Sequence, residues 1–176
     1  FTPLQTSYGV NNICLVNGRP RLLNLKQLIE EFVKFRIEVV IRRTKYELKK
    51  AEEKAHILEG LLIALAHIDE VIAIIRNSAT VDEAKEKLIA SFNLSEIQAK
   101  AILEMRLQRL VSLEVEKIQA EYDELQRQIT HFKAILDSDT MQRDIIKGEL
   151  QDIKAKFGDA RRTEIQYADD EISMED

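Results

Sequence analysis

The sequence predicts a mainly α-helical fold, in which a long antiparallel coiled-coil stalk carries a small helical head and a short β-hairpin precedes the stalk. Two segments of about forty residues each place apolar residues at alternating spacings of three and four, as coiled coils do. The chain of 176 residues has only five glycines and two prolines, too few to punctuate a fold of many strands. One Asn-Gly pair lies between two short apolar runs, which is a strong hairpin signal.

Residues 1–24 are predicted to form the hairpin segment at the base of the stalk. Within the run ICLVNGRPRLL, Asn17 and Gly18 suit a two-residue turn in which both residues need a positive φ. Pro20 cannot donate a ladder hydrogen bond, so the second strand is expected at a sheet edge. Because two strands alone are marginally stable, we expect the hairpin to pack against another element.

Residues 25–56 are predicted to form the ascending stalk helix. No proline interrupts the chain from Leu25 to Ala66, so the helix is expected to continue to about Ala66 and to be roughly 60 Å long. Its apolar seam consists of Leu25, Leu28, Phe32, Phe35, Val39 and Tyr46, with Arg42 in the remaining position.

Residues 57–112 are predicted to form the helical head, because short segments here begin with Ser, Thr or Asp, which cap helix N-termini. The predicted N-caps are Asp69, Thr80, Ser95 and, for the return helix, Ser112. Thr80 and Ser95 are each followed three residues later by Glu or Gln, the capping-box pattern. The helix that Ser95 opens is expected to end at Leu110.

Residues 113–158 are predicted to form the descending stalk helix. Its seam consists of Ile118, Tyr122, Leu125, Ile129, Phe132 and Leu136, and continues in the same heptad frame to Ile146, Leu150, Ile153 and Phe157. Asp139 is expected to cap a fresh helix start within this segment, and Gly158 to end it. Residues 159–176 follow as a short strand and an acidic tail that we expect to be disordered.

Charge indicates how the two stalk helices pair. Residues 42–54 carry a net charge of +3, and residues 114–124 carry −4. If residue 56 faces about residue 113, these stretches lie side by side and favour the antiparallel register. The basic residues Arg42, Arg43, Lys45, Lys49 and Lys50 then pair with the acidic helix, which we favour, or form a strip that faces DNA.

Residues 57–75 are apolar at 14 of 19 positions. Acidic residues within this stretch favour a buried core helix over a membrane span. Since the stretch is apolar around most of its circumference, it belongs either to a tight small core or to a surface that meets another chain. On the second interpretation, the candidate dimer-interface residues are Ile72, Ile75, Arg76, Met105 and Arg106.

No catalytic, metal or cofactor site is predicted in the chain. Cys14 is the only cysteine, which excludes an internal disulfide and fits a reducing compartment. The three histidines lack metal-ligand spacing, and no glycine-rich phosphate loop is present. The net charge of −5 argues against strong nucleic-acid binding by the chain as a whole. The start at Phe1, without a signal peptide, suggests a fragment of a longer protein.

Five strings of the sequence resemble the type IIA topoisomerases: TPLQTSYGVN, LVNGRPRLLNL, RRTKYELKKAEEKAHILEGLLIAL, QAKAILEMRLQRLVSLE and KFGDARRTEI. They run in order from residue 2 to residue 165. The last string is more similar to the A subunits of bacterial DNA gyrases than to those of topoisomerase IV. The resemblance implies a C-gate region, in which two long antiparallel helices carry a head and two heads meet as the exit gate for transported DNA.

The resemblance also implies a cytoplasmic homodimer that works with DNA and the B subunit of gyrase in ATP-dependent supercoiling, without a membrane. ATP and Mg²⁺ would bind elsewhere in the holoenzyme, and the DNA-cleaving tyrosine would lie upstream, so the chain alone would be noncatalytic. The alternatives are a noncatalytic coiled-coil scaffold or adaptor, and the equivalent region of topoisomerase IV. A scaffold would not require the Asn-Gly hairpin or the RRTEI segment, so we favour the gate.

Overall fold

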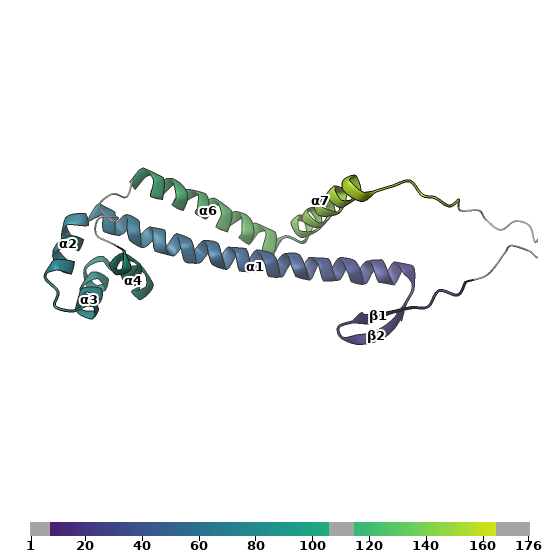
Figure 1. Cartoon of the computed structure of the whole chain (residues 1–176), viewed down its shortest axis with the longest axis horizontal. Coiled ribbons are helices and arrows are strands. Elements are labelled where there is room, and N and C mark those ends of the chain that lie inside the picture. The colour runs from purple at the N-terminus through teal and green to yellow at the C-terminus, as the bar shows by residue number, and fades with distance from the viewer. Residues whose placement is uncertain (1–7, 106–114, 165–176) are drawn as a thin grey trace, which may run out of the picture.

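The computed structural model is an elongated, mainly helical molecule with a β-hairpin at one end and a cluster of short helices at the other (Figure 1). The structure describes residues 8–105 and 115–164. Its elements are β1 (Asn12–Val16), β2 (Arg19–Leu23), α1 (Leu25–Ala66), α2 (Ile68–Arg76), α3 (Val81–Phe92), α4 (Glu96–Glu104), α6 (Val115–Asp137) and α7 (Asp139–Phe157). The predicted fold class is therefore confirmed.

The β-hairpin forms as predicted. Strands β1 and β2 pair antiparallel, and Val16 lies opposite Arg19 across the two-residue turn. Asn17 and Gly18 have φ angles of 51° and 75°, which Asn and Gly tolerate better than other residues. In this two-stranded sheet both strands are edges, so Pro20 disrupts no ladder to a third strand.

Helix α1 is 42 residues long and passes from the base of the stalk into the head. It starts with a capping box that the sequence analysis missed: Asn24 Oδ1 accepts from the Gln27 N–H at 2.9 Å, and Gln27 Oε1 accepts from the Asn24 N–H at 3.0 Å. The helix continues to Ala66, as predicted from the absence of breakers. The stalk and the core of the head therefore share one continuous element.

The stalk core lies between α6 and the second half of α1. Buried Ala51, Ala55 and Leu58 of α1 belong to the same apolar cluster as Leu125 and Ile129 of α6. The predicted seam of the descending helix is thus confirmed through Ile129, but further along Ile135 is buried where Leu136 was expected. The seam shifts by one position here because Ile135 packs with Val40 of α1 and Ile146 of α7 in a separate buried cluster.

The predicted register of the stalk is wrong. Across the two helices, Lys54 forms an ion pair with Glu121, and Lys133 Nζ lies 3.0 Å from a Glu52 carboxylate oxygen. Glu52 and Lys54 of α1 therefore lie opposite residues further along α6 than they would if residue 56 faced residue 113. The cause is the length of α1, which extends the ascending helix beyond residue 56 to Ala66 before the chain enters the short helices of the head.

A helix break separates α6 from α7, as predicted, but its N-cap is Ser138 and not Asp139. Ser138 Oγ accepts a hydrogen bond from the Met141 N–H, while Asp139 is the first residue of the helix. Gly158 ends α7 as predicted, but in an extended conformation with φ −71° and without the left-handed geometry of many C-caps. Glycine is needed there because a Cβ would lie 2.4 Å from the Lys154 carbonyl oxygen.

Helices α2, α3 and α4 form the head around the end of α1. The predicted caps Thr80 and Ser95 are confirmed, since their hydroxyls accept from the N–H groups of Glu83 and Gln98. Asp69 is wrong as a cap, because α2 begins one residue earlier and Asp69 lies in its first turn. There its carboxylate is favoured by the helix dipole instead.

Helix α4 ends at Glu104, and not at Leu110 as expected, because Met105 has an extended backbone with φ −80° and ψ 135°. The predictions for Arg106, Leu110, Ser112 and the acidic tail fall on residues 106–114 and 165–176, outside the described residues. Residues 159–164, the described part of the predicted strand and tail segment, contain no strand.

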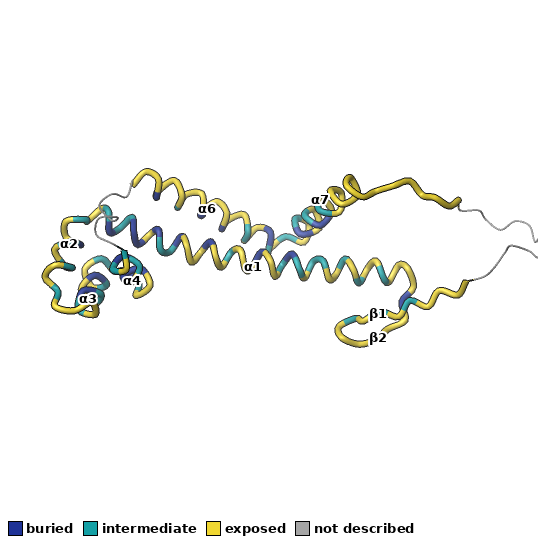
Figure 2. Tube along the Cα trace, viewed as in Figure 1, coloured by how far each residue is buried: buried dark blue, intermediate teal, exposed yellow. Residues whose placement is uncertain are grey.

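The core of the head accounts for most of the apolar stretch 57–75. Among its described side chains, Leu58, Leu61, Ala64 and Val71 are buried, and none of the larger apolar ones is exposed. They pack with Leu88, Leu94, Ala99 and Ile102 from the rest of the head. The interpretation of a tight small core is thus largely correct for this stretch. Figure 2 shows burial concentrated in the head and along α1–α6, while the base of the stalk is exposed.

Candidate partner-binding surfaces

The predicted dimer-interface residues occupy different environments in the head. Ile75 and Met105 are half-buried and pack against the core, so they help to hold the head together. Ile72 is half-buried but is not among the described members of that core, and Arg76 is exposed in the last turn of α2. Arg106 lies outside the described residues. Of the five, Ile72 and Arg76 are therefore the ones most available to a partner.

Two apolar residues on the head surface were missed by the sequence analysis. Ile97, in the first turn of α4, is 63% exposed, and Val81, the first residue of α3, is 71% exposed. Ile97 is out of phase with the buried Gln98, Ala99 and Ile102 of α4, and this spacing was the available signal. Val81 is in phase with the buried Ala84 and Leu88 of α3, so no spacing indicated its exposure.

A polar contact fixes α4 on α1. Gln98 is buried, and its Nε2 donates to the His56 carbonyl oxygen at 2.8 Å. The His56 Nε2 lies 2.6 Å from Ser95 Oγ, so the cap of α4 also contacts the stalk. Gly60 permits this approach, because a Cβ there would lie 2.7 Å from Gln98 Cβ and Cγ. The orientation of the head on the stalk therefore depends on these four residues.

Ion pairs on the head surface add a second link between helices. Lys85 of α3 lies 3.0 Å from a carboxylate oxygen of Glu96 in α4, and this hydrogen bond raises the pKa of Lys85. Within α3, the hydrogen bond from Lys87 lowers the pKa of Glu83, whose carboxylate also accepts from the Ala79 N–H at 2.9 Å. These groups are partly or fully exposed, so they orient the helices more than they stabilise them.

The basic residues of the stalk do not form one continuous set of interhelical pairs. Arg43 bonds Glu149 of α7 at 2.7 Å, whereas Lys49 and Lys50 pair with Glu53 on their own helix. Arg42 and Lys45 make no ion pair among the described residues, and all five side chains are exposed. The predicted pairing of these five residues with the acidic stretch is therefore wrong among the described residues, where only Lys54, just beyond them, pairs with that stretch, through Glu121. Arg42 and Lys45 remain without an ion pair on the part of the stalk that the structure describes.

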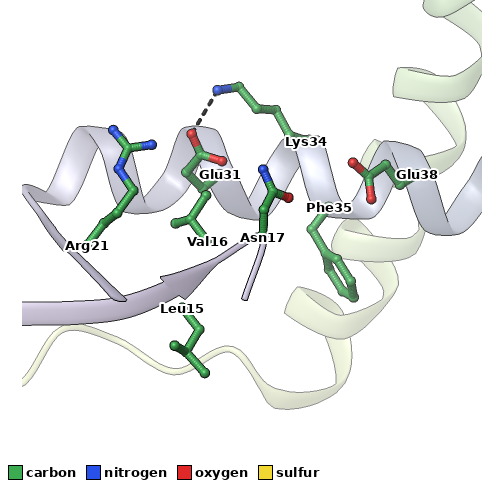
Figure 3. Close-up of a pocket in the computed structure, with 8 residues that line it drawn as sticks. All are labelled: Leu15, Val16, Asn17, Arg21, Glu31, Lys34, Phe35 and Glu38. Carbon is green, nitrogen blue, oxygen red and sulfur yellow. Dashed lines mark hydrogen bonds and ion pairs between the residues drawn. The ribbon is translucent and has the colours of Figure 1, made fainter. Parts of the chain in front are cut away.

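Two grooves flank the hairpin at the base of the stalk. One, of about 390 Å³, lies between the hairpin and α1, where Lys34 Nζ and Glu31 Oε1 are 2.8 Å apart on its rim (Figure 3). The second, of about 510 Å³, is mainly apolar and is lined by residues such as Leu28, Ile29 and Phe32. The hairpin therefore covers α1 only in part, as expected of two strands that need further support.

The outer face of the hairpin is apolar. Cross-strand partners share a face, and the pairs Ile13–Leu22 and Leu15–Pro20 both lie on the exposed side. Figure 3 shows Leu15 on the side of the hairpin away from α1. An apolar outer face is unusual for a strand pair in water and marks a contact surface.

Neither metal-ligand clusters nor membrane-spanning helices occur among the described residues. Residues 8–105 and 115–164 contain no group of three or more His, Cys, Asp or Glu side chains that could hold a metal ion. The helices that the structure describes are too short or too polar for any of them to cross a membrane.

Comparison with known proteins identifies relatives over nearly the whole chain. The family model for the A subunits of DNA gyrase and topoisomerase IV matches residues 1–151. The DNA gyrase A subunit of Clostridium acetobutylicum is 51% identical over 175 residues, which is 99% of this chain and 21% of that protein. The corresponding protein of Deinococcus deserti is 51% identical over all of this chain and 22% of its own length. That of Staphylococcus aureus is 54% identical over 94% of this chain and 19% of its own length. The chain thus spans about a fifth of the length of these relatives.

Proposed function

Because the chain belongs to the family formed by the A subunits of DNA gyrase and topoisomerase IV, we propose that it forms the exit gate of a type IIA topoisomerase. In this role α1 and α6 form the stalk, and the head of α2, α3 and α4 meets the head of a second copy. The gate itself is noncatalytic and works within ATP-dependent DNA supercoiling by the holoenzyme. In the cytoplasm, its proposed partners are a second A subunit, the B subunit of gyrase, and DNA.

One observation carries the proposal. The head lies at the end of the molecule opposite the hairpin and opposite residues 8 and 164, where the described chain begins and ends (Figure 1). A contact between two heads would therefore join two copies at a point remote from the rest of each polypeptide. A helix as long as α1, roughly 60 Å, separates the two ends. This separation is what a gate that must admit a DNA duplex requires.

Gyrase is favoured over topoisomerase IV as the parent enzyme. The matching family model includes both, but the relatives at 51% to 54% identity are gyrase A subunits. The family's ATP and Mg²⁺ sites and its cleaving tyrosine are assigned to parts of the holoenzyme outside this chain. On this proposal the purified chain leaves supercoiled plasmid unchanged in the presence of ATP and Mg²⁺. Cleavage or relaxation by the pure chain would contradict it.

The gate is tested by the mass of the chain in solution. We expect light scattering at roughly 50 µM to report a dimer, since a gate contact in the micromolar range would be saturated there. Ile72→Glu and Ile97→Glu should give monomers of unchanged helicity, because each would place two like charges in a symmetric contact. Met105→Glu is less informative, because Met105 also packs against the core.

The control variant is Ile13→Glu, which removes an exposed apolar residue at the base of the stalk and should remain dimeric. A monomeric wild-type chain would refute the gate for this part of the protein. Dimers in all head variants would place the contact elsewhere, and loss of the dimer in Ile13→Glu alone would place it at the hairpin.

A further inference from the structure

The apolar seam of α7 loses its cover toward the end of the helix. Exposure rises along its four seam positions, from 4% at Ile146 through 39% at Leu150 and 54% at Ile153 to 78% at Phe157. Helix α7 correspondingly leaves the side of α1 beyond the α6–α7 junction (Figure 1). On α1, the residues toward the base show the same loss, since Val40 is fully buried and Ile29 is exposed.

The uncovered faces of α1 and α7 match in register. Val40 and Ile146 lie in one buried cluster, and Arg36 is ion-paired with Glu149, so these contacts align the two helices antiparallel. Continuing that alignment by one heptad along both helices brings Val33 of α1 opposite Ile153 of α7. One further turn brings Ile29 opposite Phe157. Ile153 and Phe157 therefore each have an apolar partner on α1, while Leu150 lies opposite Arg36, which is ion-paired with Glu149.

A groove marks the place where the two helices diverge. It has a volume of about 440 Å³ and is lined by Val33 from α1 and by Ile146, Leu150 and Lys154 from α7, among others. In the extended register Lys154 would approach Glu30, whose only ion pair among the described residues is to Lys26 at 3.8 Å. Val33 lines neither of the grooves that flank the hairpin, whereas Ile29 also lines the apolar groove beside it, so a closing α7 would reach the edge of that groove.

The junction between α6 and α7 is built as a joint. Ser138 interrupts the helix and caps α7, and the Gln142 side chain turns back to the end of α6. Gln142 Nε2 donates to the carbonyl oxygens of Ile135 at 2.9 Å and Leu136 at 3.3 Å. The Ile135 carbonyl also accepts from the Ser138 N–H at 3.3 Å, whereas the Leu136 carbonyl has no other backbone donor among the described residues at this C-terminus of α6. Gln142 is 2% exposed, and its Oε1 has no hydrogen-bond partner among the described residues. One buried polar atom at the joint therefore lacks a hydrogen bond in this arrangement.

We propose that α7 is a hinged arm that turns about Ser138 and closes on the first half of α1, pairing Ile153 with Val33 and Phe157 with Ile29. The occupant of the exposed face of α1 is thus the chain's own α7. When α7 closes on α1, the apolar faces of both helices are removed from water. When α7 opens, the contacts of Ile146 and Glu149 with α1 near the joint are kept. The base of the stalk therefore changes width without unfolding either helix.

The hinge is tested by distance measurement between spin labels in the whole chain, with Cys14→Ser as the background. Labels at Lys26→Cys and Lys156→Cys report on the base, and labels at Lys45→Cys and Thr130→Cys on the paired part of α1 and α6. We expect two distances for the first pair, one of them much the shorter, and one narrow distance for the second. A single distance for the first pair, whether long or short, would overturn the hinge.

Seam variants test what closes the arm. Ile153→Asp with Phe157→Asp should remove the short distance, because charges would then lie in the apolar contact. The matched control is Gly148→Asp, which adds an acid to α7 at a position where a Cβ meets nothing within 4 Å. It should retain both distances. Persistence of the short distance in the seam variant, or its loss in the control, would overturn closure through this seam.

Discussion

At the scale of single residues, two helical glycines show how surroundings decide the role of one residue type. Gly60 of α1 lies against Gln98, where a Cβ would come within 2.7 Å of the side chain. Gly148 of α7 faces open space, and a Cβ there would meet nothing within 4 Å. Glycine inside a helix costs about 0.5–1 kcal/mol relative to alanine. At Gly60 the packing of Gln98 requires glycine despite this cost, whereas at Gly148 no contact requires glycine.

We expect Gly148→Ala to raise the free energy of unfolding by about 0.5–1 kcal/mol, as for an unhindered helix position. Gly60→Ala should lower it, since Gln98 would have to leave its contact with the His56 carbonyl and α4 would shift on α1. Urea unfolding followed by circular dichroism measures both. Equal effects of the same sign in the two variants would contradict this assignment.

The helix caps show how far local chemistry could be predicted. Thr80 and Ser95 were identified because each is followed three residues later by Glu or Gln, which completes a capping-box pattern. Ser138 and Asp139 are adjacent, and both suit an N-cap, so only the backbone conformation distinguishes them. Helix α2 follows His67 without a side-chain cap, because it comes directly after α1, and no residue type signals such a start.

At the scale of elements, Glu149 links α1 to α7. Arg43 first, through its hydrogen bond, and Arg36 hold the pKa of Glu149 below its ordinary value of 4.5. A carboxylate with a lowered pKa in the folded state stabilises it at pH values above the ordinary pKa. That contribution is lost as the pH falls through the lowered pKa, so it is present at pH 7 and fades in acid.

Glu149→Gln should therefore lower the free energy of unfolding at pH 7 by about 1 kcal/mol, a value typical of partly exposed ion pairs. The difference from the wild type should shrink below about pH 4. Urea unfolding at both pH values measures it. Glu47→Gln is the control, since Glu47 is exposed and makes no ion pair among the described residues. A pH-independent difference for Glu149→Gln would show that packing, and not charge, is responsible.

The pairing of α1 with α6 is tested by exchanging the partners of an interhelical ion pair. Lys54→Glu should lower the free energy of unfolding by up to about 1 kcal/mol, because Lys54 is paired with Glu121 and both are about half exposed. Adding Glu121→Lys should recover most of the loss. Adding Glu116→Lys instead should not, since no ion pair joins Glu116 to Lys54 in this register. Recovery by Glu116→Lys would favour the register first predicted from the charge pattern.

The seam of α6 could be predicted, whereas the seam of α1 and the register and bend of the stalk could not. Apolar spacing gives the buried face of α6, as Leu125 and Ile129 confirm. The predicted seam of α1 is wrong, because its large apolar residues toward the base are exposed and Val40 and Thr44 are buried instead; the exposed seam residues are Leu25, Phe32, Phe35 and Tyr46. The alignment of two helices depends on where the chain turns, and α1 continues into the head without any break in its pattern. The direction of α7 depends on the Ser138 joint and on Gln142, a polar residue in a buried position that a hydrophobic pattern does not indicate.

At the scale of the whole molecule, burial is uneven along one helix. The buried positions of α1 run from Val40 to Ala64, and among its described residues none before Val40 is buried. A helix without tertiary cover has only marginal stability of its own. Although α1 is continuous, its two halves should therefore open with different free energies.

Amide hydrogen exchange should resolve this difference. We expect amides of α1 between residues 51 and 64, which lie under the core of the head and α6, to be the most protected. Amides between residues 29 and 38 should exchange faster, because this part contains no buried residue and is covered only in part by the hairpin, by α7 and by the end of α6. Within α7, protection should fall from Ile146 toward Phe157, in parallel with the rise in exposure.

Ile153→Asp with Phe157→Asp should accelerate amide exchange between residues 29 and 38 while leaving exchange in residues 51–64 unchanged, since only the first set faces the seam of α7. Equal protection along the whole of α1 in that variant would mean that something other than α7 stabilises the base of the stalk.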